Sequence, residues 1–144
     1  LFEQQVDTSP EATAVVFEGS SLTYAELDRR ANQIAHALIE RGVGPDSLVA
    51  LCAPRSLEMV VGLLGILRAG GAYVPLDPDY PPERLAFMLQ DAQAAVVLTH
   101  SGVGDRLPES SAAMLLLDDA ALWDGYPQSR TARRAGAQDL AYLI

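Results

Sequence analysis

Few side chains in this sequence have the chemistry of a catalytic group. His36 and His100 are its two histidines among 144 residues. His100 follows a predicted strand of an α/β fold, where functional residues often collect, although the sequence shows no partner for it. His36 lies one position from the apolar face of a predicted helix, so we expect a partly buried or surface position. Neither histidine is placed by the sequence to give a cysteine the cationic setting that a reactive thiol needs.

The single cysteine and the paired aspartates all favour structural interpretations. Cys52 lies in an apolar run, which predicts a small buried core residue rather than a catalytic thiol. One cysteine excludes an intrachain disulfide and a cysteine-based zinc cluster. The pairs Asp77/Asp79 and Asp118–Asp119 could bind a cation, but such aspartates are far more often solvated turn residues.

Phosphate-binding motifs of the two common types are absent from the sequence. It has no Gly-Lys-Ser/Thr triplet, and Gly102–Val103–Gly104 lacks the third glycine and the following helix of a dinucleotide fingerprint. Trp123 and Tyr126 would form either a small binding patch or, more simply, a packed surface loop. The residues alone therefore indicate no catalytic, cofactor-binding or metal-ligating group.

Length, charge and hydropathy limit the class of protein. The chain has the length of one domain, and 49% hydrophobic residues fit a soluble globular protein. A net charge of -9 argues against a nucleic-acid or membrane-surface partner, because both need clustered cations. Glu3 and Asp7 interrupt the region where a secretory signal needs an apolar core, and Met59–Leu67 is too short to span a bilayer. A cytoplasmic location is the resulting expectation.

Alternation of strand-type and helix-period segments predicts an α/β fold in layers, with a largely parallel sheet flanked by helices. The predicted strands cover residues 14–17, 47–53, 72–76, 95–98, 114–117 and 139–144. The predicted helices cover residues 1–6, 24–41 and 57–69, and Pro81–Pro82 opens a fourth with Leu85, Met88 and Leu89 inward. The predicted irregular segments are a turn at 18–21, a polar loop at 100–111 and a surface excursion at 120–137.

The second predicted helix has clear start and stop signals. Thr23 can cap it, and Glu26 completes a capping box. Gly42 stands at the left-handed position that ends such helices. The helical period predicts an inward face of Leu27, Ala31, Ile34, Leu38 and Ile39, and an outward face of Asp28, Arg29, Arg30 and Gln33.

The third predicted helix is apolar almost all round, which indicates a position between layers. Gly62 and Gly65 cost it about 1 kcal/mol each relative to alanine. We expect close approach of a neighbouring element as compensation, in preference to a loosened helix. Gly70–Gly71 ends this helix before the next strand.

Four parts of this chain form a recognisable pattern: Leu22–Leu27, Arg55–Val61, Leu67–Asp77, and Tyr80–Pro81 with Glu83–Leu85. Together they resemble the amino-acid-activating adenylation domains of nonribosomal peptide synthetases. Leu22–Leu27 matches their first core motif, and Leu67–Asp77 matches the second nearly residue for residue. Tyr80–Pro81 and Glu83–Leu85 match the segment that follows, and Arg55–Val61 resembles the helix start between the motifs. The resemblance covers residue 1 to about Thr99 and resumes at Asp139–Ile144. The Tyr-Val-Pro-Leu-Asp-Pro run favours this branch over the related acyl-CoA synthetases and luciferases.

The resemblance implies a two-step reaction that uses ATP and Mg²⁺. An amino-acid carboxylate attacks the α-phosphorus of ATP, and the aminoacyl group then passes to the phosphopantetheine thiol of a carrier protein. The family's catalytic and binding residues have no counterpart among these 144 positions, so no catalytic, cofactor-binding or metal residue is carried over. Residues 1–144 are expected to be a single partial domain, the N-terminal portion of the large subdomain, ending just before the phosphate-binding loop. The chain alone is expected to bind neither ATP nor Mg²⁺ and to be inactive.

Other interpretations stay open at this point. One is an acyl- or aryl-acid adenylating ligase of the same superfamily. Another is a non-catalytic docking or scaffold piece that contacts a neighbouring condensation domain or completes a split enzyme. A small flavodoxin-like binder is the most distant. Asp77 is expected to be structural, with contact to a partner or to the phosphate loop as the alternative. Alone, the chain is expected to aggregate or to need the remainder of the adenylation domain.

Overall fold

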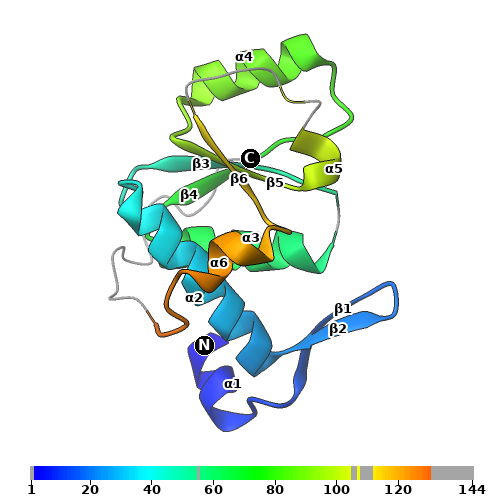
Figure 1. Ribbon diagram of the computed structural model, residues 1–144, viewed down its shortest axis with the longest axis vertical. Helices are drawn as coiled ribbons and strands as arrows, with labels where there is room; N and C mark the ends of the chain where they lie inside the picture. The colour runs from blue at the N-terminus through cyan, green and yellow to red at the C-terminus, as the bar shows by residue number, and fades with distance from the viewer. Residues whose placement is uncertain (1, 55, 105–106, 108–111, 131–144) are drawn as a thin grey trace.

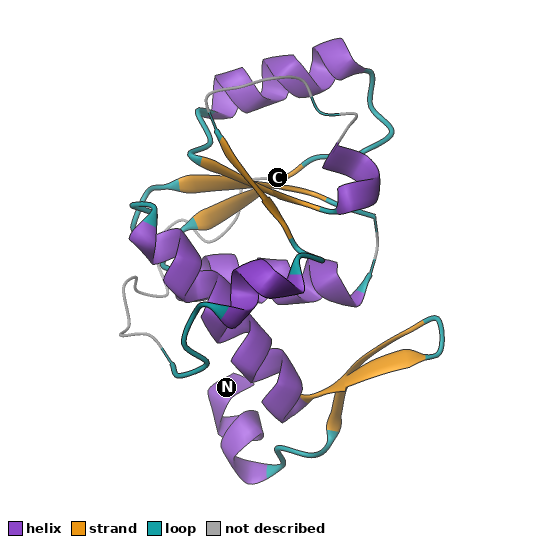
Figure 2. Cartoon of the chain, in the orientation of Figure 1, coloured by secondary structure: helices purple, strands orange, loops and turns teal. Residues whose placement is uncertain are grey.

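The computed structural model describes residues 2–54, 56–104, 107 and 112–130 of the chain. Over these residues the chain forms a four-stranded parallel sheet with helices on both faces and a separate two-stranded hairpin (Figure 1 and Figure 2). The predicted α/β class is therefore confirmed. No helix among these residues is both long and apolar enough to cross a bilayer.

The elements follow the predicted order with shifted ends. The hairpin consists of β1 (Thr13–Phe17) and β2 (Ser20–Thr23), and the sheet of β3 (Leu48–Cys52), β4 (Ala72–Pro75), β5 (Val96–Thr99) and β6 (Ala113–Leu116). The helices are α1 (Phe2–Thr8), α2 (Tyr24–Glu40), α3 (Leu57–Arg68), α4 (Pro82–Ala92), α5 (Ser101–Gly104) and α6 (Ala120–Asp124). The strand predicted at residues 139–144 lies outside the described residues.

The sheet has the strand order β4-β3-β5-β6, and every neighbouring pair is parallel. Successive residues of β3 face opposite sides, as the pleat requires. Val49 and Leu51 pack in one apolar core with α2, α3 and Trp123 of α6, whereas Ala50 and Cys52 pack in a second core with α4 and Val103 of α5. Figure 1 shows α4 on one side of the sheet and α2, α3 and α6 on the other. Both faces of the sheet are thus covered, which explains why its strands are apolar runs.

The start and stop signals of α2 are confirmed. The Thr23 hydroxyl accepts a hydrogen bond from the Glu26 backbone N–H, and the Glu26 carboxylate accepts one from the Thr23 N–H, both at 3.1 Å. These bonds satisfy donors that a helix start otherwise leaves unpaired. At the other end, Gly42 has a φ of +89°, a conformation that glycine adopts without strain.

The glycines of α3 mark close approaches, as predicted. A Cβ atom on Gly65 would lie 2.5 Å from Ile34 Cγ2 of α2, so the two helices can approach this closely because Gly65 has no side chain. A Cβ on Gly62 would lie 3.2 Å from Leu117 Cδ2, after the end of β6. α3 is therefore pressed between α2 and the sheet. Packing contacts at these positions offset the lower helix propensity of glycine.

Three predicted irregular segments contain regular structure. Ser20 and Ser21 belong to β2, because Glu18 and Gly19 both adopt positive φ and close a two-residue hairpin turn. The predicted loop after β5 contains the short helix α5. The predicted surface excursion at 120–137 begins with α6, which Asp119 caps by accepting a hydrogen bond from the Leu122 N–H.

The predicted outward face of α2 was wrong at two positions. Asp28 and Gln33 are buried, at 9% and 8% exposure. Gln33 donates to the backbone oxygen of Tyr126, and Asp28 pairs with Arg68 of α3. The period of a helix shows which residues share a face, but it does not show that residues 126–130 cover the polar face.

Candidate functional site

The carboxyl edge of the parallel sheet is the natural place for a site. In open α/β sheets, ligands bind beside the carboxyl ends of strands whose following connections leave toward opposite faces. Here β3 leads to α3 on one face and β5 leads to α5 on the other. The buried Thr99 hydroxyl donates a 2.6 Å hydrogen bond to the Cys52 carbonyl oxygen, which joins these two strand ends. Protein groups, rather than an open crevice, therefore lie directly between them.

One cluster of reactive side-chain types does form at this edge. Asp118, after β6, accepts hydrogen bonds from both the backbone N–H (3.0 Å) and the hydroxyl of Ser101, after β5. The Nε2 atom of His100 lies 3.6 Å from Asp118 Oδ2. The Gly102 backbone N–H donates to His100 Nδ1 at 3.2 Å, which leaves the proton of a neutral ring on Nε2, toward Asp118. The structure thus supplies the partner of His100 that the sequence did not reveal.

Strand order explains why this partner was missed. β5 and β6 are parallel neighbours, with Thr99 level with Leu116, so the residues that follow them meet. The sequence placed both strands correctly within a residue or two. The sequence contains no signal that β5 and β6 are neighbouring strands. Asp118 meets the residues after β5 because these two strands are neighbours.

The hydrogen-bond pattern of the cluster is not that of an activated nucleophile. Such a site needs the hydroxyl bonded to the imidazole, which accepts its proton. In this cluster the Ser101 hydroxyl donates to the Asp118 carboxylate, and His100 Nδ1 accepts from the Gly102 backbone N–H. The hydroxyl of Ser101 also holds the pKa of Asp118 below its usual value, which makes this carboxylate a weak base. The cluster joins the ends of β5 and β6.

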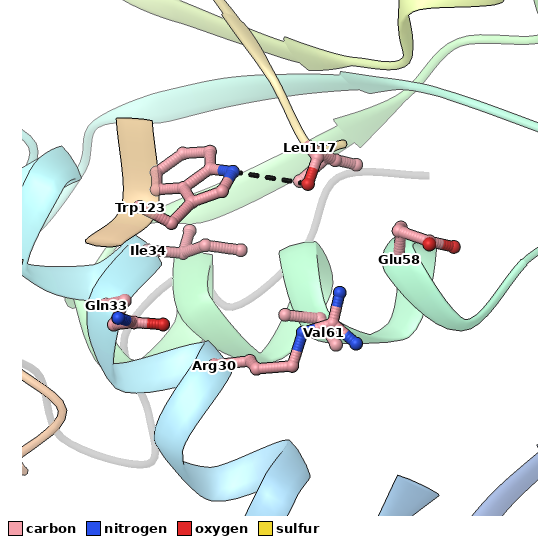
Figure 3. A pocket seen from close by; sticks show the side chains of 7 residues that line it. All are labelled: Arg30, Gln33, Ile34, Glu58, Val61, Leu117 and Trp123. Atoms are coloured by element: carbon pink, nitrogen blue, oxygen red, sulfur yellow. Dashed lines mark hydrogen bonds between the residues drawn. The ribbon is translucent and has the colours of Figure 1, made fainter. Parts of the chain in front are cut away.

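A small pocket opens between α2, α3 and α6 (Figure 3). Its lining consists of Arg30, Gln33, Ile34, Glu58, Val61, Leu117 and Trp123. Water-sized spheres can occupy only about 20 Å³ of it, which is room for about one water molecule and far too little for a small-molecule ligand. The apolar side chains of this lining belong to the core shared by α2, α3 and α6.

Trp123 is a core residue rather than part of a binding patch. Its side chain is 7% exposed, and its indole N–H donates to the carbonyl oxygens of Leu116 and Leu117 at 3.1 and 3.2 Å. The second of these bonds is drawn in Figure 3. Its ring centroid lies 6.5 Å from that of Tyr126. Both aromatic residues are therefore packed, but Trp123 lies in helix α6 and in the core rather than in the predicted surface loop.

The remaining candidates also have structural contacts. Cys52 is fully buried, as predicted. His36 is half-buried, and its Nε2 lies 2.9 Å from the Ser129 carbonyl oxygen. Asp77 is an exposed turn residue whose carboxylate accepts from the Asp79 N–H at 2.9 Å. Across the described part of the chain, no three histidine, cysteine or acidic side chains gather into a possible metal site.

Comparison with known proteins places the chain in a family. The family model described as "AMP-binding enzyme" matches residues 2–144. The chain is 53% identical to tyrocidine synthase 3 of Brevibacillus parabrevis over 145 residues and 50% identical to a linear gramicidin synthase of the same organism over 143 residues. These matches cover 100% and 99% of the chain but 2% of each relative, so the chain spans a small part of their length.

A solved structure agrees with these matches. The crystal structure of the nonribosomal peptide synthetase FmoA3 superposes with a TM-score of 0.93 at 38% identity, over 99% of this chain and 15% of that one. The resemblance expected from the Leu22–Leu27 and Leu67–Asp77 motifs is therefore confirmed by both sequence and structure. This chain belongs to the AMP-binding enzyme family, and its relatives are nonribosomal peptide synthetases.

Proposed function

We propose that this chain is part of a domain that activates an amino acid for nonribosomal peptide synthesis. In the first step an amino-acid carboxylate attacks the α-phosphorus of ATP, which forms an aminoacyl adenylate and releases pyrophosphate. In the second step the thiol of a carrier protein's phosphopantetheine attacks the adenylate carbonyl, and AMP leaves. The observation that carries the proposal is about 50% identity to two peptide synthases over nearly the whole chain.

Ligands of the structural neighbour support the use of ATP. FmoA3 has been solved with α-methyl-L-serine-AMP and with AMPPNP, an adenylated amino acid and an ATP analogue. Both fit the first step of the proposed reaction. We propose ATP and Mg²⁺ as the requirements of the complete domain, because Mg²⁺ offsets phosphate charge during such transfers.

The described residues do not by themselves fit ATP or Mg²⁺. No three potential metal ligands gather among them. The carboxyl-edge cluster has one carboxylate, which already accepts two hydrogen bonds from Ser101. We propose that residues 1–144 are one part of a larger adenylation domain, which supplies the catalytic groups. Its proposed partners are a carrier protein and a neighbouring condensation domain, in the cytoplasm and in pathways that include antibiotic synthesis.

Amino-acid-dependent exchange of pyrophosphate into ATP tests the proposal. The whole protein is incubated with each amino acid in turn, and incorporation of labelled pyrophosphate into ATP is measured. We expect exchange with one or a few amino acids and none with the 144-residue chain alone. Exchange by that chain alone would contradict the placement of the catalytic groups elsewhere.

The same assay separates the alternatives. Exchange that depends on a fatty or aryl acid, and not on any amino acid, would favour an acyl- or aryl-acid ligase. Absence of exchange with every acid, together with capture of a condensation domain, would favour a docking piece. The identity to peptide synthases supports the amino-acid reaction over both.

A further inference from the structure

The segment that follows α6 lies against α2, and polar side chains of α2 bind its backbone. We call residues 126–130 the strap. Asn32 Nδ2 donates to the carbonyl oxygen of Gln128 at 2.9 Å, and Gln33 Nε2 donates to that of Tyr126 at 3.4 Å. His36 Nε2 lies 2.9 Å from the carbonyl oxygen of Ser129. Because these contacts use backbone oxygens, they fix the course of the strap whatever side chains it carries.

Of the three α2 side chains that bind the strap, that of Asn32 is the most deeply buried. Its side chain is 1% exposed, and its Oδ1 atom accepts a hydrogen bond from Arg68 Nη1 at 2.6 Å. Arg68 also pairs with Asp28, so the amide is oriented by a buried ion pair. Its Nδ2 is thereby turned toward the strap. In the closed state the strap carbonyl satisfies this otherwise buried donor, and a leucine at position 32 could not make the bond.

The far end of the strap is held by charge. Arg130 makes two hydrogen bonds to the carboxylate of Asp7 in α1, at 2.9 and 3.4 Å, and its Nε lies 3.8 Å from Asp28 Oδ2. Two guanidinium groups and two carboxylates thus connect α1, α2, α3 and the strap. The Arg130–Asp7 pair is largely exposed, with side chains 36% and 67% accessible, so water and salt weaken it.

The two ends of the strap differ in how firmly they are attached. At its start, Tyr126 packs beside the buried Trp123, and its hydroxyl accepts a hydrogen bond from Arg41 at 2.9 Å. From Pro127 to Arg130 every residue is exposed. A segment with little buried apolar surface opens at lower free energy than the core. Within residues 123–130, Pro127–Arg130 should therefore open more easily than Trp123.

We propose that the strap is a conformational element of the fold that opens locally while the sheet stays folded. Asn32 acts as its latch, with Arg68 and Asp28 holding the amide in the closed orientation. The Arg130–Asp7 pair is a weaker, salt-sensitive second attachment. This inference does not depend on the proposed amino-acid activation.

Trypsin cleavage after Arg130 measures the opening. Trypsin must take the Arg130 guanidinium into its own pocket, so cleavage requires release from Asp7 and Asp28. When opening and closing are fast, the cleavage rate follows the population of the open strap. The experiment compares the whole wild-type protein with Asn32→Leu and follows each cleavage site by mass spectrometry. We expect about 10-fold faster cleavage after Arg130 in Asn32→Leu, from loss of the partly buried hydrogen bond to Gln128.

Matched variants keep the test decisive. Arg29→Leu places the same side chain on the exposed face of α2 and should leave cleavage after Arg130 at the wild-type rate. Asp7→Asn alters only an exposed group, and we expect about twofold faster cleavage from this small change. An unchanged rate after Arg130 in Asn32→Leu would overturn the proposal. Equal acceleration after Arg30 and Arg84, in α2 and α4, would also overturn it, because the whole fold and not the strap would then be opening. If Asn32→Leu does not fold, an unchanged rate in Asp7→Asn would overturn the proposal.

Discussion

The contact between α2 and α3 and the carboxyl edge of the sheet are built in opposite ways. In the first, two helices approach so closely that a Cβ on Gly65 would lie 2.5 Å from Ile34 Cγ2. In the second, the polar groups of His100, Ser101 and Asp118 stay partly accessible and join two strand ends. Apolar contact fixes the layers, whereas hydrogen bonds fix how the chain leaves the sheet. Histidine, serine and aspartate side chains, which often act in catalysis, here make hydrogen bonds and ionic contacts that hold two strand ends together.

The largest effect is expected where the helices touch. Gly65→Val forces branched carbons into the space of Ile34 and should lower the free energy of unfolding by about 3 kcal/mol. Gly62→Ala is the control, because its new methyl would meet the flexible ends of Leu117 and Leu51 at 3.2 and 3.3 Å. With the gain in helix propensity, we expect it to stay within about 1 kcal/mol of wild type. Urea unfolding of the whole protein checks both values, and equal losses would refute the close-contact account.

A smaller effect is expected at the start of α2. Thr23→Ala removes the hydroxyl that accepts from the Glu26 N–H and should cost about 1 kcal/mol of stability. Thr23→Ser keeps the hydroxyl and should recover most of that loss. Thermal unfolding compares the three proteins. If serine were as harmful as alanine, packing of the threonine methyl group and not the cap would be responsible.

At the carboxyl edge we expect an effect that depends on pH. The Ser101 hydroxyl lowers the pKa of Asp118 from its ordinary 3.8, so folding favours the charged carboxylate. This contribution is complete above that ordinary value and is lost as pH falls through the lower folded value. Asp118→Asn should therefore lower stability near neutral pH and approach wild type below about pH 4. The free energy of unfolding of the variant and of wild type, measured from acidic to neutral pH, checks this prediction. If the difference between the two proteins did not change with pH, the charge of the carboxylate would not be its cause.

Local signals predicted most of the fold. The capping box of Thr23 and Glu26, the glycines of α3 and the apolar strands all act over a few residues, and each is confirmed. The second motif, Leu67–Asp77, forms a helix end and a buried strand, with Gly70 at a φ of +86°. These patterns are readable because neighbours along the chain determine them.

Contacts between distant segments could not be predicted in this way. Asp118 meets Ser101 only because β5 and β6 are neighbours. Gln33 donates to Tyr126, which lies 93 positions further on, and Asp28 pairs with Arg68, 40 positions further on. Helix periodicity treats a polar face as solvated, and it carries no information about a later segment that covers it.

We propose that the polar cluster at the carboxyl edge is structural and takes no part in the proposed reaction. Amino-acid-dependent pyrophosphate exchange by the whole protein carrying His100→Ala or Ser101→Ala tests this role directly. Rates are compared per folded molecule, with folding checked by circular dichroism. We expect rates within about twofold of wild type for both variants. A loss of about 100-fold or more in either, the size expected when a general acid or base is removed, would contradict it.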